Sequence, residues 1–199
     1  MRMGHDEGMT SSQSPRARYL WLLRHGKAAS DAPWGGRDRD RPLTGRGRRD
    51  ATALGKRLAG EDPVLGLTGV PGPQLVICSA AVRTRQTAGL VVEAVGDRLP
   101  LDSLDALYGA DTDVVLRYIR EVDEGVGSVL VVGHNPTIYQ LAWELLADGR
   151  DGRERGDRAV LESRGFPTCA LAVLALGVPS WEDAADGCAT LEGVFKPPY

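Results

Sequence analysis

The sequence predicts an α/β domain in three layers, with helices packed on both faces of a mostly parallel central sheet. Three short and largely apolar runs carry this prediction: residues 19–23, 74–78 and 128–132 have the length and composition of strands buried on both faces. A stretch with helical periodicity follows each run, and strands that alternate with helices are typical of a parallel sheet. At 199 residues the chain suits a single domain, which we expect to span residues 19–199.

Charge and composition argue against several classes of partner. The 24 Lys and Arg residues against 27 Asp and Glu give a net charge of −3, so we expect neither a nucleic-acid nor a membrane partner. Residues 1–18 are polar and lack the apolar core of a signal peptide, and we expect them to form a disordered N-terminal extension. The three cysteines, Cys78, Cys169 and Cys188, are widely spaced and form no CxxC, and we expect Cys78 and Cys169, which lie in apolar runs, to be buried, reduced thiols in a cytoplasmic protein. Arginine far outnumbers lysine, which is typical of bacteria with GC-rich genomes.

The remaining elements are predicted from helix caps, apolar periodicity and breakers. Before the third strand we expect a helix from Thr44 through Leu58, a Gly/Pro-rich connector at 66–73 and a helix that is capped by Ser79 and runs to about Val95. These elements are followed by a short edge strand at 99–101, a loop at 102–111 and a helix from Asp111 or Thr112 to about Val122. After it we expect a helix with Pro136 in its first position, a charged and mostly exposed loop at 148–165, and strands at 168–176 and 189–194.

Polar residues follow each of the three central strands at the point where the strand ends. Arg24 and His25 follow the first strand, Ser79 leads from the second strand into Arg83, and His134 follows the third. Open α/β sheets bind their ligands at the carboxyl ends of the strands. We therefore expect the two histidines and two arginines to converge on one site.

Such a cluster could bind a metal ion, bind a phosphate group or form a structural ion network. The sequence has no HExxH or CxxC pattern, and converging arginines would repel a cation, so we expect no metal and no cofactor. Guanidinium groups match phosphate oxygens, and helix N-termini near Ser79 and His134 would add main-chain donors. A neutral His25 could attack such a phosphate and form a phosphohistidine, while Arg24, Arg83 and His134 stabilise the charge on the phosphoryl oxygens.

Three motifs, in this order, resemble the histidine phosphatase superfamily: LLRHG at 22–26, SAAVRTRQT at 79–87 and VVGHNP at 131–136. The segment DRDRPLT at 38–44 is similar to its SixA-type phosphohistidine phosphatase branch. The resemblance implies a phosphoglycerate mutase-like fold, with His25 as the nucleophile and Arg24, Arg83 and His134 as the phosphate pocket. It also makes Arg41 a further contact, and we expect Ser79 and Asn135 to help bind the phosphorylated substrate.

The larger members of that family carry a glutamate general acid after the second strand-helix unit, whereas this chain has LDALYG at 104–109 there. Asp105, Asp38 and Asp31 are the remaining candidates for the acid. An imidazole leaving group needs a proton less than an alkoxide does, so the missing glutamate favours a phosphohistidine substrate in a protein. The alternatives are a small-molecule phosphomonoesterase that uses Asp105, and a module that binds a phosphorylated ligand without turnover.

Overall fold

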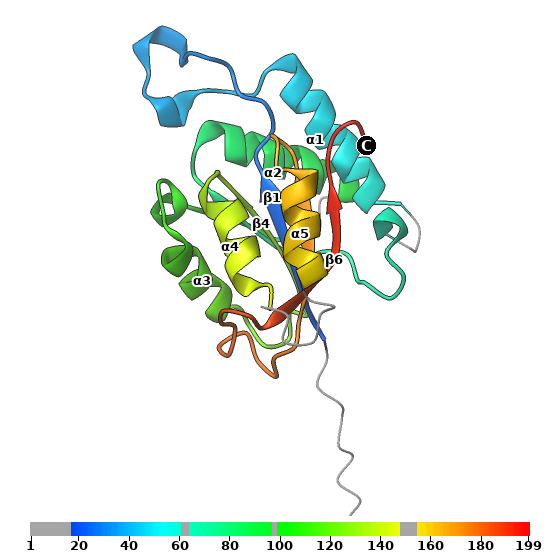
Figure 1. Ribbon diagram of the computed structural model, residues 1–199. Coiled ribbons are helices and arrows are strands. Elements are labelled where there is room, and N and C mark those ends of the chain that lie inside the picture. The colour runs from blue at the N-terminus through cyan, green and yellow to red at the C-terminus, as the bar shows by residue number, and fades with distance from the viewer. Residues whose placement is uncertain (1–16, 61–63, 97–98, 148–154) are drawn as a thin grey trace, which may run out of the picture.

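A six-stranded mixed sheet with helices on both faces forms the framework of the protein (Figure 1). The computed structural model describes residues 17–60, 64–96, 99–147 and 155–199. The strand order is β3-β2-β4-β1-β5-β6. The bounds are β1 (Arg18–Arg24), β2 (Leu75–Ser79), β3 (Leu101–Leu104), β4 (Ser128–Gly133), β5 (Leu171–Leu176) and β6 (Ala189–Phe195). The first four strands in this order are parallel, while β5 pairs antiparallel with β1 and with β6. The predicted mostly parallel sheet is confirmed.

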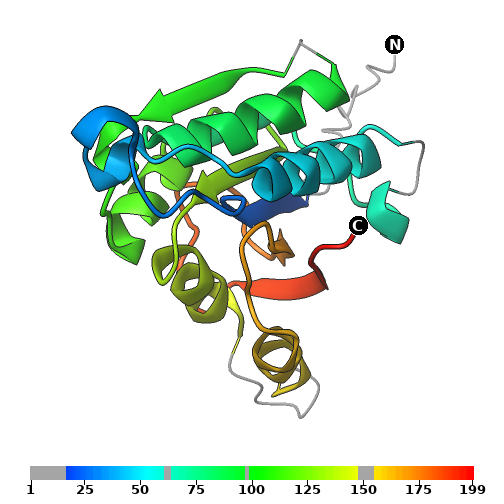
Figure 2. The ribbon, with the colours of Figure 1, turned by 90° about the horizontal axis from the view of Figure 1, so that it is seen from above.

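Successive residues of the central strands point to opposite faces of the sheet, and each face has its own helical layer. Leu20 and Leu22 of β1 belong to one apolar cluster, whereas Trp21 and Leu23 belong to the other, and all four are fully buried. Helices α1 (Gly45–Leu58) and α2 (Val82–Val95) cover the Trp21 face, and α3 (Thr112–Arg120), α4 (Thr137–Leu145) and α5 (Arg155–Arg164) cover the Leu20 face. Figure 2 shows the sheet between these two layers, as expected where both strand faces are apolar.

Helix α1 illustrates how local sequence sets an element in place. The Thr44 hydroxyl accepts a hydrogen bond from the Gly47 amide at 3.1 Å and so caps the helix. Ala51, Leu54 and Leu58, which lie on one face, are buried against the sheet. The predicted helix from Thr44 through Leu58 is therefore confirmed, with Thr44 as the N-cap.

Residues 148–154 of the predicted loop at 148–165 lie outside the described residues, and the structure corrects the remainder, because residues 155–164 form helix α5. Among the side chains described for this helix, those of residues 156–164, only Leu161 is fully buried, so the helix lacks a clear apolar stripe. Polar contacts hold it instead: Arg158 donates to the carbonyl oxygens of Trp143 and Leu146, and Asp157 accepts from the Leu191 amide. These partners are distant in sequence, so the periodicity of residues 155–164 does not indicate a helix.

Other boundaries differ by a few residues. Ser79 does not cap α2, because it is the last residue of β2 and the helix begins at Val82 after Ala81. The edge strand β3 lies at 101–104, later than the predicted 99–101, and it takes the first residues of the predicted loop. Residues 1–16 of the expected N-terminal extension lie outside the described residues. Arg18, which was assigned to that extension, is the first residue of β1 and pairs with Glu124.

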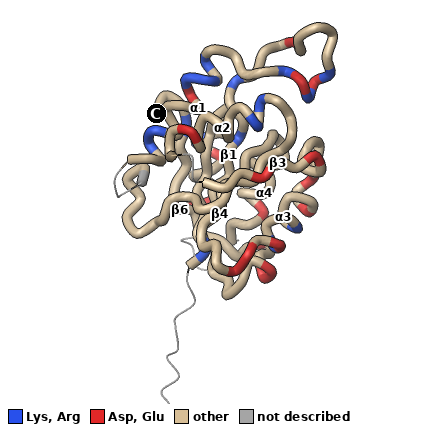
Figure 3. The backbone as a smooth tube through the Cα atoms, turned by 180° about the vertical axis from the view of Figure 1, so that it is seen from behind, with Lys and Arg blue, Asp and Glu red and all other residues tan. Residues whose placement is uncertain are grey.

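Charge is distributed unevenly along the long axis of the molecule. Basic residues gather at the end formed by α1 and the loop before it, and acidic residues gather at the opposite end, around α3 (Figure 3). None of the helices in the described part of the chain combines the length and apolar character needed to cross a membrane.

Candidate active site

The carboxyl ends of β1, β2 and β4 lie side by side and bring the predicted residues together. In the sheet register Arg24 is opposite Gly133, and Cys78 is opposite Val132. The His25 amide donates to the Gly133 carbonyl at 3.0 Å, which extends the ladder between β1 and β4 to the histidine itself. His25 and His134 therefore face one another, with 5.2 Å between their ring centroids.

Gly26 turns the chain away from β1 at a point where no side chain fits. A Cβ atom on Gly26 would lie 2.8 Å from the Gly47 carbonyl oxygen of α1. The Gly26 amide donates to the Thr87 hydroxyl of α2 at 3.0 Å. Two helices thus fix the backbone next to His25, and glycine is needed for the close approach.

The His25 ring is oriented by a hydrogen bond to its neighbour. Nδ1 lies 2.7 Å from the Gly26 carbonyl oxygen, and because a carbonyl can only accept, Nδ1 carries the proton. Nε2 is then left with a free electron pair. Burial lowers the pKa of His25 from 6.5 to about 4, and the charges of Arg83, Arg24 and Arg41 add to this effect despite the opposing Gly26 bond. The imidazole is neutral at pH 7.

His134 is also held neutral, with both nitrogens engaged. Arg83 Nη2 lies 3.3 Å from Nδ1, and Ser79 Oγ lies 3.0 Å from Nε2. Since a guanidinium only donates, Nδ1 accepts and Nε2 donates to the serine hydroxyl. Burial lowers the pKa of His134 to about 3, and the electrostatic interactions with Arg83 and with His25 in its protonated form act in the same direction. Ser79 is fully buried, so it supports His134 from the end of β2.

The arginines surround these two rings and have unused donors. Arg83 is 6% exposed, and its Nε atom, like that of Arg24, is buried without a hydrogen-bond partner among the described residues. Arg24 Nη1 donates to the Phe166 carbonyl at 2.9 Å, and Asn135 Nδ2 donates to the same oxygen at 3.2 Å. Buried N–H groups without partners are costly. An anion bound between the arginines and histidines would offset that cost.

Asp38 links three donors at the edge of this cluster. Its carboxylate accepts from Arg41 Nε at 2.8 Å, from Arg83 Nη2 at 3.0 Å and from the Tyr108 hydroxyl at 2.9 Å. Hydrogen bonding to Arg41, followed by that to Tyr108 and the charge of Arg83, lowers the pKa of Asp38 to about 2. An ionised carboxylate has no proton to give at pH 7, so the geometry argues against Asp38 as a general acid.

The other two candidate acids lie on the surface. Asp105 forms an ion pair with Arg39 at 2.6 Å, and 79% of its side chain is exposed. Asp31 accepts from the neighbouring Ser30 hydroxyl at 2.7 Å in an exposed loop. Neither carboxyl group forms a hydrogen bond or ion pair with His25 or His134 among the described residues.

Sequence reasoning missed Tyr108. Besides its bond to Asp38, its ring packs edge-on against His134 with 5.8 Å between centroids. The one sequence signal for Tyr108 was its place in segment 104–109, which occupies the position of the glutamate general acid in larger members of the family that the motifs resemble. The signal is otherwise absent because Asp38 and Tyr108 are far apart in the sequence.

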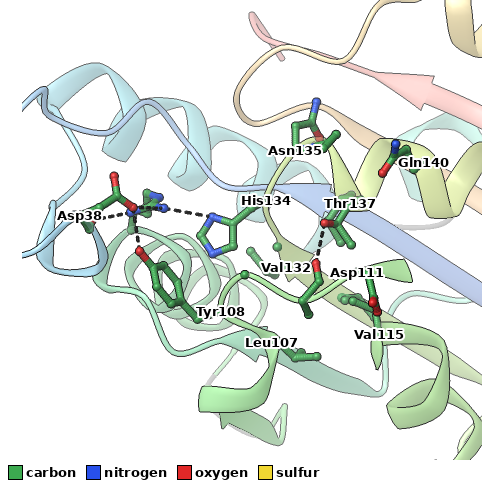
Figure 4. A pocket seen from close by; sticks show the side chains of 17 residues that line it. Asp38, Leu107, Tyr108, Asp111, Val115, Val132, His134, Asn135, Thr137 and Gln140 are labelled. Carbon is green, nitrogen blue, oxygen red and sulfur yellow. Dashed lines mark hydrogen bonds and ion pairs between the residues drawn. The ribbon is translucent and has the colours of Figure 1, made fainter. Parts of the chain in front are cut away.

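A cavity of about 540 Å³ opens beside His134. Asp38, Arg83 and His134 line one end of it, while Arg24 and His25 lie beside it and do not line it. Figure 4 shows His134 between Asp38 and Tyr108 on one side and Thr137 and Gln140 on the other. Five buried apolar side chains also line it: Leu107, Val115, Val131, Val132 and Ile138. A charged anion site thus adjoins a largely apolar hollow.

The model of the histidine phosphatase superfamily (branch 1) matches residues 20–115. Rv1276c of Mycobacterium tuberculosis (strain ATCC 25618 / H37Rv) is 37% identical over 177 residues, which are 88% of this chain and 99% of that protein. The phosphohistidine phosphatase SixA of Escherichia coli (strain K12) is 32% identical over 63% of this chain and 73% of its own length. A solved structure of a SixA protein from Nakamurella multipartitia is 36% identical, with a TM-score of 0.73, and covers 92% of this chain and 98% of that one.

Proposed function

This chain belongs to the histidine phosphatase superfamily and is a phosphatase, and from that premise we propose that it hydrolyses phosphohistidine in a phosphoprotein through a phosphohistidine formed on His25. We assign the phosphate-binding roles to Arg24, Arg83 and His134, with Arg41 as a further contact. In this assignment the Nε2 proton of His134, which is donated to the Ser79 hydroxyl in the free protein, is donated to a phosphoryl oxygen when substrate binds. The proposal places the reaction in the cytoplasm, in keeping with the free thiols of the three cysteines.

The observation that carries this proposal is the state of His25. The bond from Nδ1 to the Gly26 carbonyl leaves the electron pair on Nε2, and the lowered pKa keeps the ring neutral. Nε2 attacks phosphorus, the bond from phosphorus to the leaving group breaks, and that group departs with the electron pair. Water then attacks the phosphoryl group on His25, and inorganic phosphate is released with the imidazole restored. Arginine donors stabilise the charge on the phosphoryl oxygens in both steps.

The shortage of a proton donor supports phosphohistidine as the substrate. General acid catalysis contributes on the order of 10²–10⁴-fold when the leaving group is strongly basic. Asp38 is ionised and bound to Arg41 and Arg83, and Asp105 is paired with Arg39 on the surface. An imidazole leaves phosphorus with less help than an alkoxide. A site built this way suits a P–N bond better than an alkyl phosphate ester.

A second candidate is a small phosphomonoester with an apolar body. The cavity beside His134 supports it, because about 540 Å³ lies within the range of small-molecule pockets. Leu107, Val115 and Ile138 would contact the body of such a ligand while Arg83 and His134 engage its phosphate. This candidate uses the same nucleophile and differs only in the leaving group.

A direct substrate comparison tests the proposal. The purified chain would be given a phosphohistidine peptide, free phosphohistidine, nitrophenyl phosphate and a panel of alkyl and sugar phosphates, and phosphate release would be measured with His25→Ala as the blank. We expect kcat/KM to be highest for the phosphohistidine peptide. A small ester that is turned over faster than every phosphohistidine substrate would replace the proposal with the second candidate.

A further inference from the structure

The loop between β1 and α1 presents a tryptophan entirely to solvent. Trp34 lies in the short helix η1 (Pro33–Gly35), and its exposed fraction is 103%, the largest among the exposed large apolar residues of the described part of the chain. Its backbone is left-handed, with φ of 56°, and Gly35 follows with φ of 72°. Bulky side chains rarely adopt this conformation, and outliers of this kind cluster at functional positions. Neither burial nor backbone preference explains this tryptophan within the chain alone.

This loop and helix α1 together form a segment, residues 27–57, in which positive charge is concentrated. Residues 27–57 contain nine Lys and Arg against four Asp and Glu, a net charge of +5, so the rest of the chain has −8. Arg37, Arg48 and Arg49 are exposed and form no ion pair within the described residues. Arg48, Arg49 and Lys56 also line a shallow hollow of about 350 Å³ on α1. The basic end in Figure 3 is therefore built by this segment.

Both parts of the segment are attached to the active site. The short helix η2 (Asp38–Asp40) follows Arg37 directly, and both its Asp38 carbonyl and its Asp38 carboxylate accept from Arg83, at 2.7 and 3.0 Å. The first turn of α1 rests on the residues after His25: the Thr44 amide donates to the Lys27 carbonyl at 2.8 Å, and Gly47 is in close contact with that residue. In Figure 1 the loop projects from the body at the end where these elements meet.

We infer that Trp34, with Arg37, Arg48 and Arg49, is the docking surface for an acidic phosphoprotein, and this inference rests on the proposed function. The aromatic ring supplies the apolar anchor, and the arginines supply charge complementarity to Asp and Glu side chains around the partner's phosphohistidine. Tryptophan and arginine are, with tyrosine, the residues most enriched among those that dominate binding energy at interfaces. Opposite charge on the two surfaces speeds their encounter.

A protein fits this surface better than the other ligands that arginine attracts. A small phosphorylated molecule held at Arg83 and His134 has no need of a tryptophan on a projecting loop. Nucleic acid is disfavoured because the chain as a whole is acidic, with a net charge of −3, and would repel a long polyanion that extends beyond the basic end.

The test compares matched substrates in matched variants. Two peptides would each carry a single phosphohistidine flanked by leucines, one rich in glutamate and its twin with glutamine at the same positions, and free phosphohistidine would serve as the small substrate. Trp34→Ala and the triple variant Arg37→Ser/Arg48→Ser/Arg49→Ser would be compared with Arg117→Ser. The last variant removes an exposed charge from α3 at the acidic end.

We expect Trp34→Ala to lower kcat/KM for both peptides by about tenfold or more, through KM, with free phosphohistidine unchanged. The triple variant should lower it for the glutamate peptide alone, and added salt should abolish that difference. Arg117→Ser should behave as the parent. Equal activity of parent and variants on the peptides would overturn the inference while the proposed function stands. If the parent hydrolyses no phosphohistidine substrate, both fail together. Loss of single-stranded DNA binding in the variants, with unchanged peptide kinetics, would reassign the surface to nucleic acid.

Discussion

Arg83 and Arg85 are near neighbours on α2, yet we expect their loss to have very different consequences. Residues two apart on a helix do not share a face. Arg83 is 6% exposed and reaches Asp38 and His134, whereas Arg85 points to solvent. Removing one preorganised donor from a developing oxyanion costs about 10²–10³ in kcat, or about 2.7–4 kcal/mol. An exposed arginine contributes ~0–1 kcal/mol. We therefore expect Arg83→Ala to lose at least about a hundredfold in kcat/KM, and Arg85→Ala to lose less than about fivefold.

The assay must separate lost catalysis from lost structure. Steady-state hydrolysis of phosphohistidine would be measured for both variants at a temperature where thermal melts show each to be folded. The Arg83 charge also helps to lower the pKa of His25, so NMR titration of the His25 ring should give a higher pKa in Arg83→Ala and an unchanged one in Arg85→Ala. Equal kinetic losses in the two variants, or the same His25 pKa in the parent and in Arg83→Ala, would refute the placement of this guanidinium at the phosphate.

Three further predictions concern protonation, the missing acid and the anion pocket. His25 and His134 have pKa values of about 4 and 3 in the fold against 6.5 when unfolded, so the unfolded chain binds more protons below pH 6.5. The free energy of unfolding should therefore fall as the pH drops from 6.5 toward 4, and it should fall less steeply in His25→Asn. Identical slopes in the parent and His25→Asn would contradict a buried, neutral His25 ring. Asp105→Asn should change the hydrolysis of alkyl phosphates and of nitrophenyl phosphate to the same small extent, whereas a selective loss on alkyl esters would assign Asp105 as the acid. Vanadate and tungstate should inhibit competitively and EDTA should not inhibit; loss of activity on chelation that returns with added metal would overturn the arginine pocket as the source of positive charge.

The sequence predicted those parts of the site that lie at strand ends. Arg24, His25 and His134 follow short apolar runs that are typical of buried strands, and neighbouring parallel strands bring their carboxyl ends together. Arg83 was predictable for a related reason, since it lies one residue into the helix that follows β2. Local sequence patterns were sufficient for these residues because the parallel sheet brings the strand ends that carry them into contact.

Features that depend on contacts between loops were not predictable. Asp38 and Tyr108 lie in two separate connections, and the hydrogen bonds from Arg83 of α2 and from Tyr108 to Asp38 follow from no sequence period or spacing. For the same reason Asp38 was a candidate acid from its position, while its partners in the fold keep it ionised. Helix α5 was missed because it is held by Leu161 and by polar contacts to distant carbonyls rather than by an apolar stripe.

His25 is the nucleophile of the proposed mechanism, and trapping the phosphoenzyme tests that assignment most directly. Substrate with radiolabelled phosphate would be mixed with the enzyme and quenched in alkali, where phosphohistidine survives, and the labelled peptide would be identified after digestion. We predict label on the peptide that contains His25, at Nε2, and none in His25→Ala, which should remain folded. Label on His134, on an aspartate or on a cysteine would contradict the mechanism.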